Sequence, residues 1–114
     1  MPIISNFQTL TGVAPLFYDG EVGRVANNII VLRYSKSCDP SSVPATTDFS
    51  VSGTVQTVTT VTLYNNTVRL TMSAALQNTD VLAVSYTPGT NKLQDTSGNL
   101  ALALSSESIT NNIP

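Results

Sequence analysis

The 114-residue sequence predicts an all-β domain, an immunoglobulin-like antiparallel β-sandwich of about seven strands. Short segments in which apolar and polar residues alternate recur along the chain, whereas the 3.6-residue period of an amphipathic helix is poor. Turn-forming residues separate these segments at intervals of about 8–12 residues. Charged residues make up only 11% of the chain, and its polar residues are mainly Thr, Ser and Asn. This composition suits a hydroxyl-rich β surface over a Val-rich interior.

The first part of the chain predicts two strands joined by a long connection. Residues 3–10 can form an extended N-terminal strand, and residues 29–34 form a strong one with alternating apolar residues. The intervening segment, 11–28, is predicted to be a long irregular loop that exposes Leu16, Phe17 and Tyr18.

The middle of the chain predicts a short strand around Phe49 and then a hairpin. Residues 55–63 are rich in Thr and Val, with a bulge near Val58, and residues 67–72 alternate again. Between them, Asn65 and Asn66 predict a two-residue type I′ turn, because asparagine tolerates positive φ. Asn65 also begins an Asn-x-Thr glycosylation sequon, but the turn interpretation requires no glycan and is preferred.

The last part of the chain predicts two more strands. Residues 81–86 form one strand, which ends at the turn-forming cluster 87–91, and a second turn follows at 95–99. Leucines then alternate with alanine over 100–104, and Ile109 closes the last strand. The predicted core consists of inward-facing residues of these strands: Ile30, Leu32, Phe49, Val51, Val61, Leu63, Val68, Leu70, Leu82, Val84, Tyr86, Leu102 and Leu104.

Length and charge define the domain and exclude two classes of partner, nucleic acid and anionic membranes. A chain of this length forms one domain, here residues 1–114, and buries about 65% of its unfolded surface. The formal net charge of −2 provides no electrostatic surface for nucleic acid. We see no secretory signal at the N-terminus, and the apolar run 29–32 is far shorter than a membrane span.

Little in the sequence indicates a catalytic site. Without histidine, no Ser-His-Asp or Cys-His set can form. The carboxylates are scattered, mostly at predicted turns, and no phosphate-binding or dinucleotide motif is present. The only cysteine, Cys38, has no partner within the chain for a disulfide and is interpreted as a small residue tolerated in a loop. We therefore expect a protein that is not an enzyme and holds no cofactor.

Calcium is the one metal worth considering, because its ligands are carboxylate, amide and carbonyl oxygens. Asp95 with Asn99, or Asp39 with Asp48, could meet at the end of a loop. The alternative is that these side chains make hydrogen bonds within turns. We prefer the alternative.

Several runs of residues resemble a known module. They are Leu32-Arg33-Tyr34-Ser35-Lys36, Asp39-Pro40-Ser41-Ser42-Val43-Pro44-Ala45, Val84-Ser85-Tyr86-Thr87-Pro88-Gly89-Thr90-Asn91 and Leu93-Gln94-Asp95-Thr96-Ser97-Gly98-Asn99. From about residue 29 to 112 the chain is similar to the SwmB-type repeat of large bacterial surface and adhesin-like proteins. The resemblance implies an immunoglobulin-like β-sandwich, and it leaves function open because such folds carry many functions.

Two function hypotheses follow, both without catalysis. The first is a decoration or cement protein of a phage capsid, located on the virion surface; a lone domain with its own methionine and no secretion signal suggests it. The second is a repeat of a secreted adhesin or surface-layer protein that acts as a spacer at the cell surface. Partners would be capsid proteins or further copies of the chain. The candidate docking residues are Ile3, Ile4, Phe7, Leu16, Phe17 and Tyr18.

Overall fold

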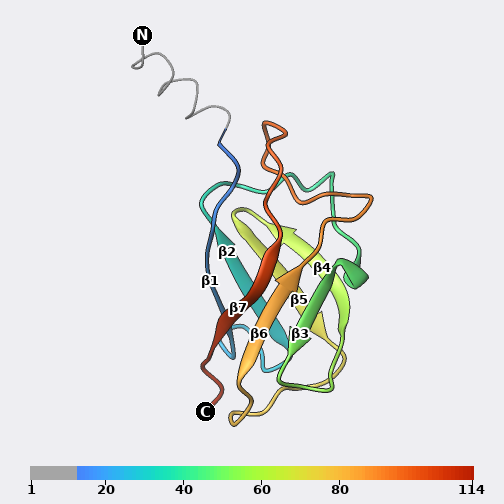
Figure 1. Cartoon of the computed structure of the whole chain (residues 1–114). Coiled ribbons are helices and arrows are strands. Elements are labelled where there is room, and N and C mark those ends of the chain that lie inside the picture. Colours follow the sequence, from blue (N-terminus) through green and yellow to red (C-terminus); the bar gives the residue numbers. More distant parts are fainter. Residues whose placement is uncertain (1–12) are drawn as a thin grey trace.

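The computed structural model describes residues 13–114, which form an all-β domain (Figure 1). One short 3-10 helix, η1, precedes β3. The elements in chain order are β1 (Phe17–Val22), β2 (Ile29–Tyr34), η1 (Thr46–Asp48), β3 (Phe49–Ser52), β4 (Val58–Tyr64), β5 (Thr67–Met72), β6 (Leu82–Tyr86) and β7 (Leu104–Asn111).

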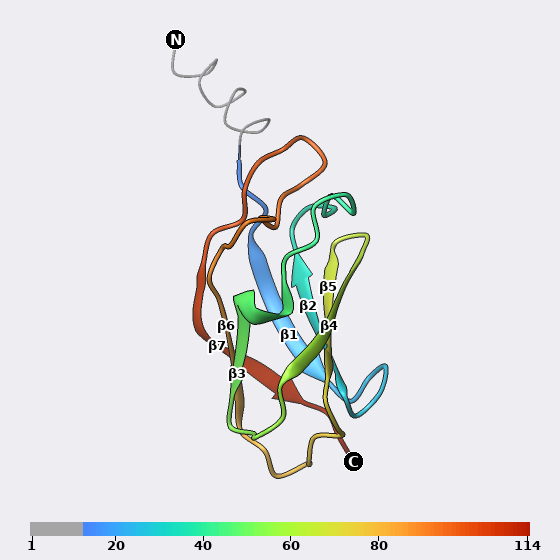
Figure 2. The ribbon, with the colours of Figure 1, turned by 90° about the vertical axis from the view of Figure 1, so that its right-hand side faces the viewer.

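The strands hydrogen-bond in the order β3-β6-β7-β1-β2-β5-β4, so a single seven-stranded sheet folds over on itself. All neighbours are antiparallel except β1 and β7, which are parallel and are joined by only two register pairs, Glu21↔Thr110 and Val22↔Asn111. Figure 2 shows β3, β6 and β7 on one side of the molecule and β2, β5 and β4 on the other. The all-β prediction with seven strands is confirmed, and the arrangement fits a β-sandwich.

The core lies between these two groups of strands, where the alternating pattern places the apolar residues. Phe49 of β3 stacks on Tyr86 of β6 with ring centroids 4.9 Å apart. Every second residue of β2, β5 and β6 is buried: Ile30, Leu32, Tyr34, Val68, Leu70, Met72, Leu82, Val84 and Tyr86. The predicted core residues Val51, Val61, Leu63 and Leu104 are partly buried and pack against this cluster.

The prediction that Leu102 belongs to the core is wrong, because the strand expected to carry it begins only at Leu104. Leu102 is 69% exposed, whereas its neighbour Ala101 is buried. The Ala101 N–H donates to the carbonyl of Leu93 at 2.9 Å, within the connection between β6 and β7. The buried side chain in this connection is Leu93, which is fully buried. The leucine-alanine alternation therefore belongs to a loop and does not mark a core-facing strand.

The prediction of an irregular loop over 11–28 is also wrong, because β1 lies within this segment. Its sequence contains Asp19, Gly20 and Glu21, residues that are rare in strands. Gly20 is buried because β1 passes close to its neighbours: a Cβ at this position would lie 2.5 Å from Ile109 Cδ1. The predicted strand over residues 3–10 lies outside the described residues.

The predicted hairpin between β4 and β5 is confirmed, with corrections at its turn and its start. Tyr64 pairs with Thr67, and Asn65 has φ of 53°. Among non-glycine residues 13–114, only Asn65 and Ser106 have positive φ, so the turn has one left-handed residue where a type I′ turn has two. The expected bulge is present as a register shift between Val58 and Thr60. The strand starts at Val58, not at Val55, which is 91% exposed.

The described chain begins and ends at opposite ends of the molecule. Figure 1 shows that it approaches β1 at one end and leaves after β7 at the other. The side-chain amide of Asn78, in the β5–β6 connection, donates to the carbonyl of Pro114 at 3.3 Å. Within residues 13–114, no helix is both long and apolar enough to cross a membrane.

Candidate functional site

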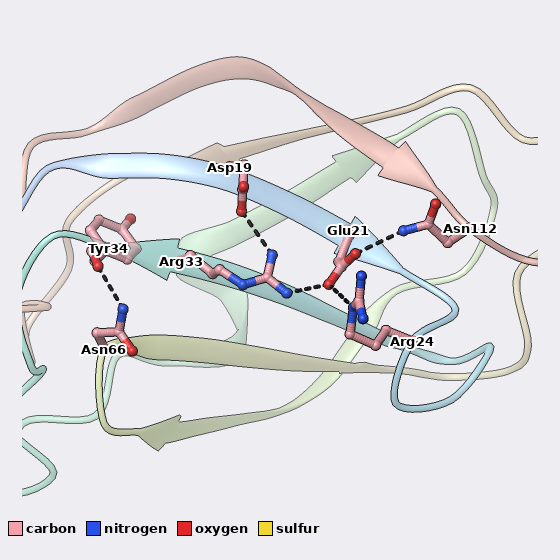
Figure 3. Close-up of polar contacts among 7 residues, drawn as sticks. All are labelled: Asp19, Glu21, Arg24, Arg33, Tyr34, Asn66 and Asn112. Carbon is pink, nitrogen blue, oxygen red and sulfur yellow. Dashed lines mark hydrogen bonds and ion pairs between the residues drawn. The ribbon is translucent and has the colours of Figure 1, made fainter.

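A cluster of charged and amide side chains lies beside the parallel contact of β1 with β7, and we call it the junction network (Figure 3). Its central residue is Glu21 of β1, a carboxylate that is only 6% exposed. A buried carboxylate is unfavourable unless partners compensate the lost hydration. The network consists of Asp19, Glu21, Arg24, Arg33 and Asn112.

Glu21 connects three parts of the chain. Arg33 of β2 donates to Glu21 Oε1 through Nη2 and to Asp19 Oδ1 through Nη1, the latter at 2.8 Å. Arg24, in the turn after β1, donates to the same Oε1 at 2.6 Å. Asn112, just beyond β7, donates to Oε2 at 2.7 Å. One carboxylate therefore joins β1 to its antiparallel neighbour and to the segment that leaves the domain.

The charges of the network are fixed by these contacts. The hydrogen bond from Arg33 lowers the pKa of Glu21 below its ordinary value of 4.5, and the contact with Arg24 acts in the same direction, against the effect of burial. The hydrogen bond to Glu21 in turn raises the pKa of Arg33. At neutral pH, Glu21 is thus an anion between two guanidinium cations. This arrangement suits holding strands together and does not suit proton transfer.

The backbone at the junction is packed too closely for side chains. Gly23 has φ of 101°, and a Cβ there would lie 2.7 Å from the carbonyl carbon of Asn112. The Asn112 N–H donates to the carbonyl of Val22 at 2.8 Å and extends the pairing of the two strands by one bond. Glycine at this position allows the segment after β7 to lie against the end of β1.

The candidate docking residues that the structure describes differ in how exposed their side chains are. Leu16 and Tyr18 are 49% and 69% exposed at the start of β1. Phe17 between them packs inward, edge to face against Tyr34, with ring centroids 5.8 Å apart. Ile3, Ile4 and Phe7 lie outside the described residues. Among the candidates within residues 13–114, Leu16 and Tyr18 are placed where a partner could reach them.

The calcium candidates Asp95 and Asn99 do lie together, in the arrangement of a hydrogen-bonded turn. Asp95 Oδ1 accepts from the backbone N–H groups of Ser97 and Asn99, each at 2.9 Å. Oδ2 accepts from the Asn99 amide at 2.9 Å and lies 3.4 Å from Lys36 Nζ. Burial alone would raise the pKa of Asp95, but hydrogen bonds from Asn99 and Ser97 outweigh it and lower the pKa. Both oxygens have donors, as the turn interpretation expects.

The other pair of calcium candidates, Asp39 and Asp48, makes separate contacts. Asp39 accepts from the backbone and hydroxyl of Ser41 and from the Gln94 amide. Asp48 lies at the end of η1 beside Gly89. Over residues 13–114, no group of three or more Cys, Asp or Glu side chains is placed to hold a metal ion.

Cys38 lies in the connection between β2 and η1, as the loop interpretation expects, and its side chain is part of the core. It is 4% exposed and forms an isolated β-bridge with Asp95. Burial, with the nearby Asp95 charge, raises the pKa of its thiol from 9.0 to about 11. A thiol of this kind is a poor nucleophile at neutral pH.

A shallow cleft of about 510 Å³ lies between the β3–β4 and β5–β6 connections. Its apolar rim includes Val55, and Val81 beside it is 87% exposed. The lining residues are Gly53, Thr54, Val55, Gln56, Ala75, Gln77 and Asp80.

The junction network is absent from the sites predicted from the sequence, because the prediction for residues 11–28 is a loop. One signal could have found it. Asp19 and Glu21 precede the turn-forming residues 23–28, and Arg33, of opposite charge, follows them. Cross-strand partners in a hairpin are placed in this way. The link from Glu21 to Asn112 has no such signal, because those residues are 91 positions apart.

The charged residues of this all-β sandwich tie its strands together. A family model described as "Putative flagellar system-associated repeat" matches residues 11–91, and the chain belongs to this family. The resemblance to a repeat family is thereby confirmed, but the match covers residues 11–91 and not the expected range of about 29–112, and it gives no support for an adhesin. Membership of a repeat family suggests a structural or interaction module. Comparisons with curated proteins and with solved structures found no match.

Proposed function

We propose that the protein is a non-enzymatic structural repeat that acts as a spacer in an extended surface assembly. The observation that carries the proposal is the opposite placement of the two ends of the described chain in a member of a repeat family. Units with this geometry can be joined end to end, each adding its own length. A repeat that contacts mainly its neighbours in this way forms an elongated molecule.

The strand order supports an immunoglobulin-like form of the sandwich. β1-β2-β5-β4 and β3-β6-β7 correspond to the ABED and CFG sheets of the seven-stranded immunoglobulin arrangement. Such sandwiches present their loops at two ends, which is where successive units of a tandem array would meet.

The chemistry of the polar clusters supports a role without catalysis. Glu21 is held as an anion by Arg33 and Arg24, and Asp95 accepts hydrogen bonds at both oxygens. Neither carboxylate has the raised pKa of a general acid.

Partners in this proposal are further copies of the unit or neighbouring proteins of the same assembly, located at the cell surface. Of the two hypotheses drawn from the sequence, the surface repeat is favoured over the capsid decoration protein, because membership of a repeat family suits the former directly.

A tandem protein tests this proposal. Two copies of the chain joined end to end would be compared with the single chain by small-angle X-ray scattering, with mass checked by light scattering. We expect the maximum dimension to increase nearly in proportion to the number of copies. A pair that folds side by side, with little increase in maximum dimension, would contradict the spacer function.

A further inference from the structure

The path of tension through the domain runs along β1 and β7. Force applied to the two ends of the chain pulls β1 from its N-terminal end and β7 from its C-terminal end. Because these strands are parallel and adjacent, the two pulls act in opposite directions along one shared interface. The strands must then slide past each other before either can leave the domain.

Sliding of β7 along β1 requires several contacts to break together. The register pairs Glu21↔Thr110 and Val22↔Asn111 are followed by the bond from Asn112 N–H to the Val22 carbonyl. The Asn112 amide holds the Glu21 carboxylate at 2.7 Å, and Glu21 is held to β2 by Arg33. Displacement by one residue would separate all of these groups.

The N-terminal approach to β1 is also fastened. Leu16 N–H donates to Ser35 Oγ, and Ser35 N–H donates to the Leu16 carbonyl, each at 2.8 Å. Lys36 Nζ donates to the carbonyl of Val13. Tension therefore reaches β1 along its own axis and does not first peel it from β2.

We propose that the β1–β7 junction is a mechanical clamp, in which Asn112 and Glu21 resist shear when the chain is under tension. The proposal rests on the proposed function as a spacer, since a unit in a chain of repeats transmits any force applied to the whole. Bonds loaded in shear share the force and break together, whereas bonds at a peeling end break one at a time. Resistance of this kind is a property of the unfolding rate.

The direction of pulling provides the first test, by single-molecule force spectroscopy on the full chain. In one geometry, handles are attached at the two termini. In the other, one handle is on V25C and one on the C-terminus, so that both pull from the end where β7 leaves and peel it from β1. Val25 is 45% exposed, and the buried thiol of Cys38 leaves V25C as the reactive site. We expect an unfolding force about twofold or more higher for the terminal attachment.

Two asparagine variants provide a matched comparison. Asn112→Ala removes the amide hydrogen bond to Glu21, and Asn66→Ala removes an amide hydrogen bond of similar length, 2.9 Å, to the Tyr34 carbonyl (Figure 3). Asn66 lies in the β4–β5 turn, outside the junction. With terminal handles, we expect Asn112→Ala to lower the unfolding force and Asn66→Ala to leave it nearly unchanged.

The clamp is refuted by equal unfolding forces in the two pulling directions, or by equal effects of the two variants. If Asn112→Ala does not fold, the comparison of directions in the unmodified junction still decides. These measurements use a single copy, so their outcome is independent of the scattering experiment on tandem copies. A compact tandem with a direction-dependent unfolding force would therefore contradict the spacer function and leave the clamp standing.

Discussion

Asn112 donates a hydrogen bond from its side-chain amide to Oε2 of Glu21, 2.7 Å away, and joins residues 91 positions apart in the sequence. The other oxygen of the same carboxylate, Oε1, accepts hydrogen bonds from Arg33 and Arg24. A single buried side chain thus connects the first described strand, its neighbour and the segment where the chain leaves the domain. Contacts of such long range are lost together when the domain unfolds.

The first prediction concerns the charge of Glu21. Glu21→Gln removes the anion that holds both guanidinium groups, and we expect it to lower the free energy of unfolding by about 2 kcal/mol, as for other hydrogen bonds to charged groups. Asp19→Asn is the matched control. Asp19 also pairs with Arg33, but its side chain is 60% exposed, so its loss costs about 0.5 kcal/mol. Urea denaturation measures both, and equal effects would contradict a special role of the buried carboxylate.

The second prediction is a loss of stability in acid. Partners in the folded protein lower the pKa of Glu21 below 4.5 and those of Asp39 and Asp95 below 3.8. Stability from such groups is fully present above the unfolded-state pKa and is lost as pH falls through the folded one. The melting temperature should therefore be level from pH 7 to about 5 and fall below about pH 4. The melting temperature of Glu21→Gln should fall less over the same pH range. If the variant and the unmodified protein have the same acid profile, the loss of stability comes from other carboxylates.

The third prediction concerns the thiol of Cys38. Burial raises its pKa from 9.0 to about 11, which lowers the thiolate fraction at pH 8 by about two orders of magnitude. Native protein should react slowly with a disulfide reagent at pH 8, and urea-unfolded protein should react fast. An exposed thiol is the control: Val55→Cys combined with Cys38→Ala places it at a site that is 91% exposed. Rapid reaction of the native Cys38 would show that the bridge with Asp95 opens readily.

The fourth prediction concerns calcium at the turn formed by Asp95 and Asn99. Because both oxygens of Asp95 already have donors, addition of calcium after treatment with EDTA should leave the melting temperature unchanged. Asp95→Ala should lower the melting temperature with or without calcium, since backbone N–H groups of the turn lose their acceptor. A rise in melting temperature with calcium, absent in Asp95→Ala, would identify a calcium site.

Much of the fold could be predicted from the sequence, because alternation determines which face of a strand is buried. Leu32, Leu70 and Val84 lie in strands whose pattern matches their burial. The pattern failed for β1, where the carboxylates of Asp19 and Glu21 are compensated by Arg33 on the next strand. Apolar alternation does not predict that compensation, which only the opposite charges on either side of the turn indicate. The junction depends on the pairing of β1 with β7, which come from opposite ends of the described chain. Only the folded topology establishes this pairing.

The fifth prediction compares two leucines for which the sequence predicted the same environment. Leu70→Ala empties a fully buried position on β5, and we expect a loss of about 3 kcal/mol in the free energy of unfolding. Leu102→Ala makes the same chemical change at a side chain that is 69% exposed, and its effect should be within about 0.5 kcal/mol. Urea denaturation of the two variants checks both values. A large loss of stability in Leu102→Ala would mean that the Leu102 side chain is covered in solution, either by another part of the β6–β7 connection or by another copy of the chain. Dilution separates the two explanations, because only the second depends on protein concentration.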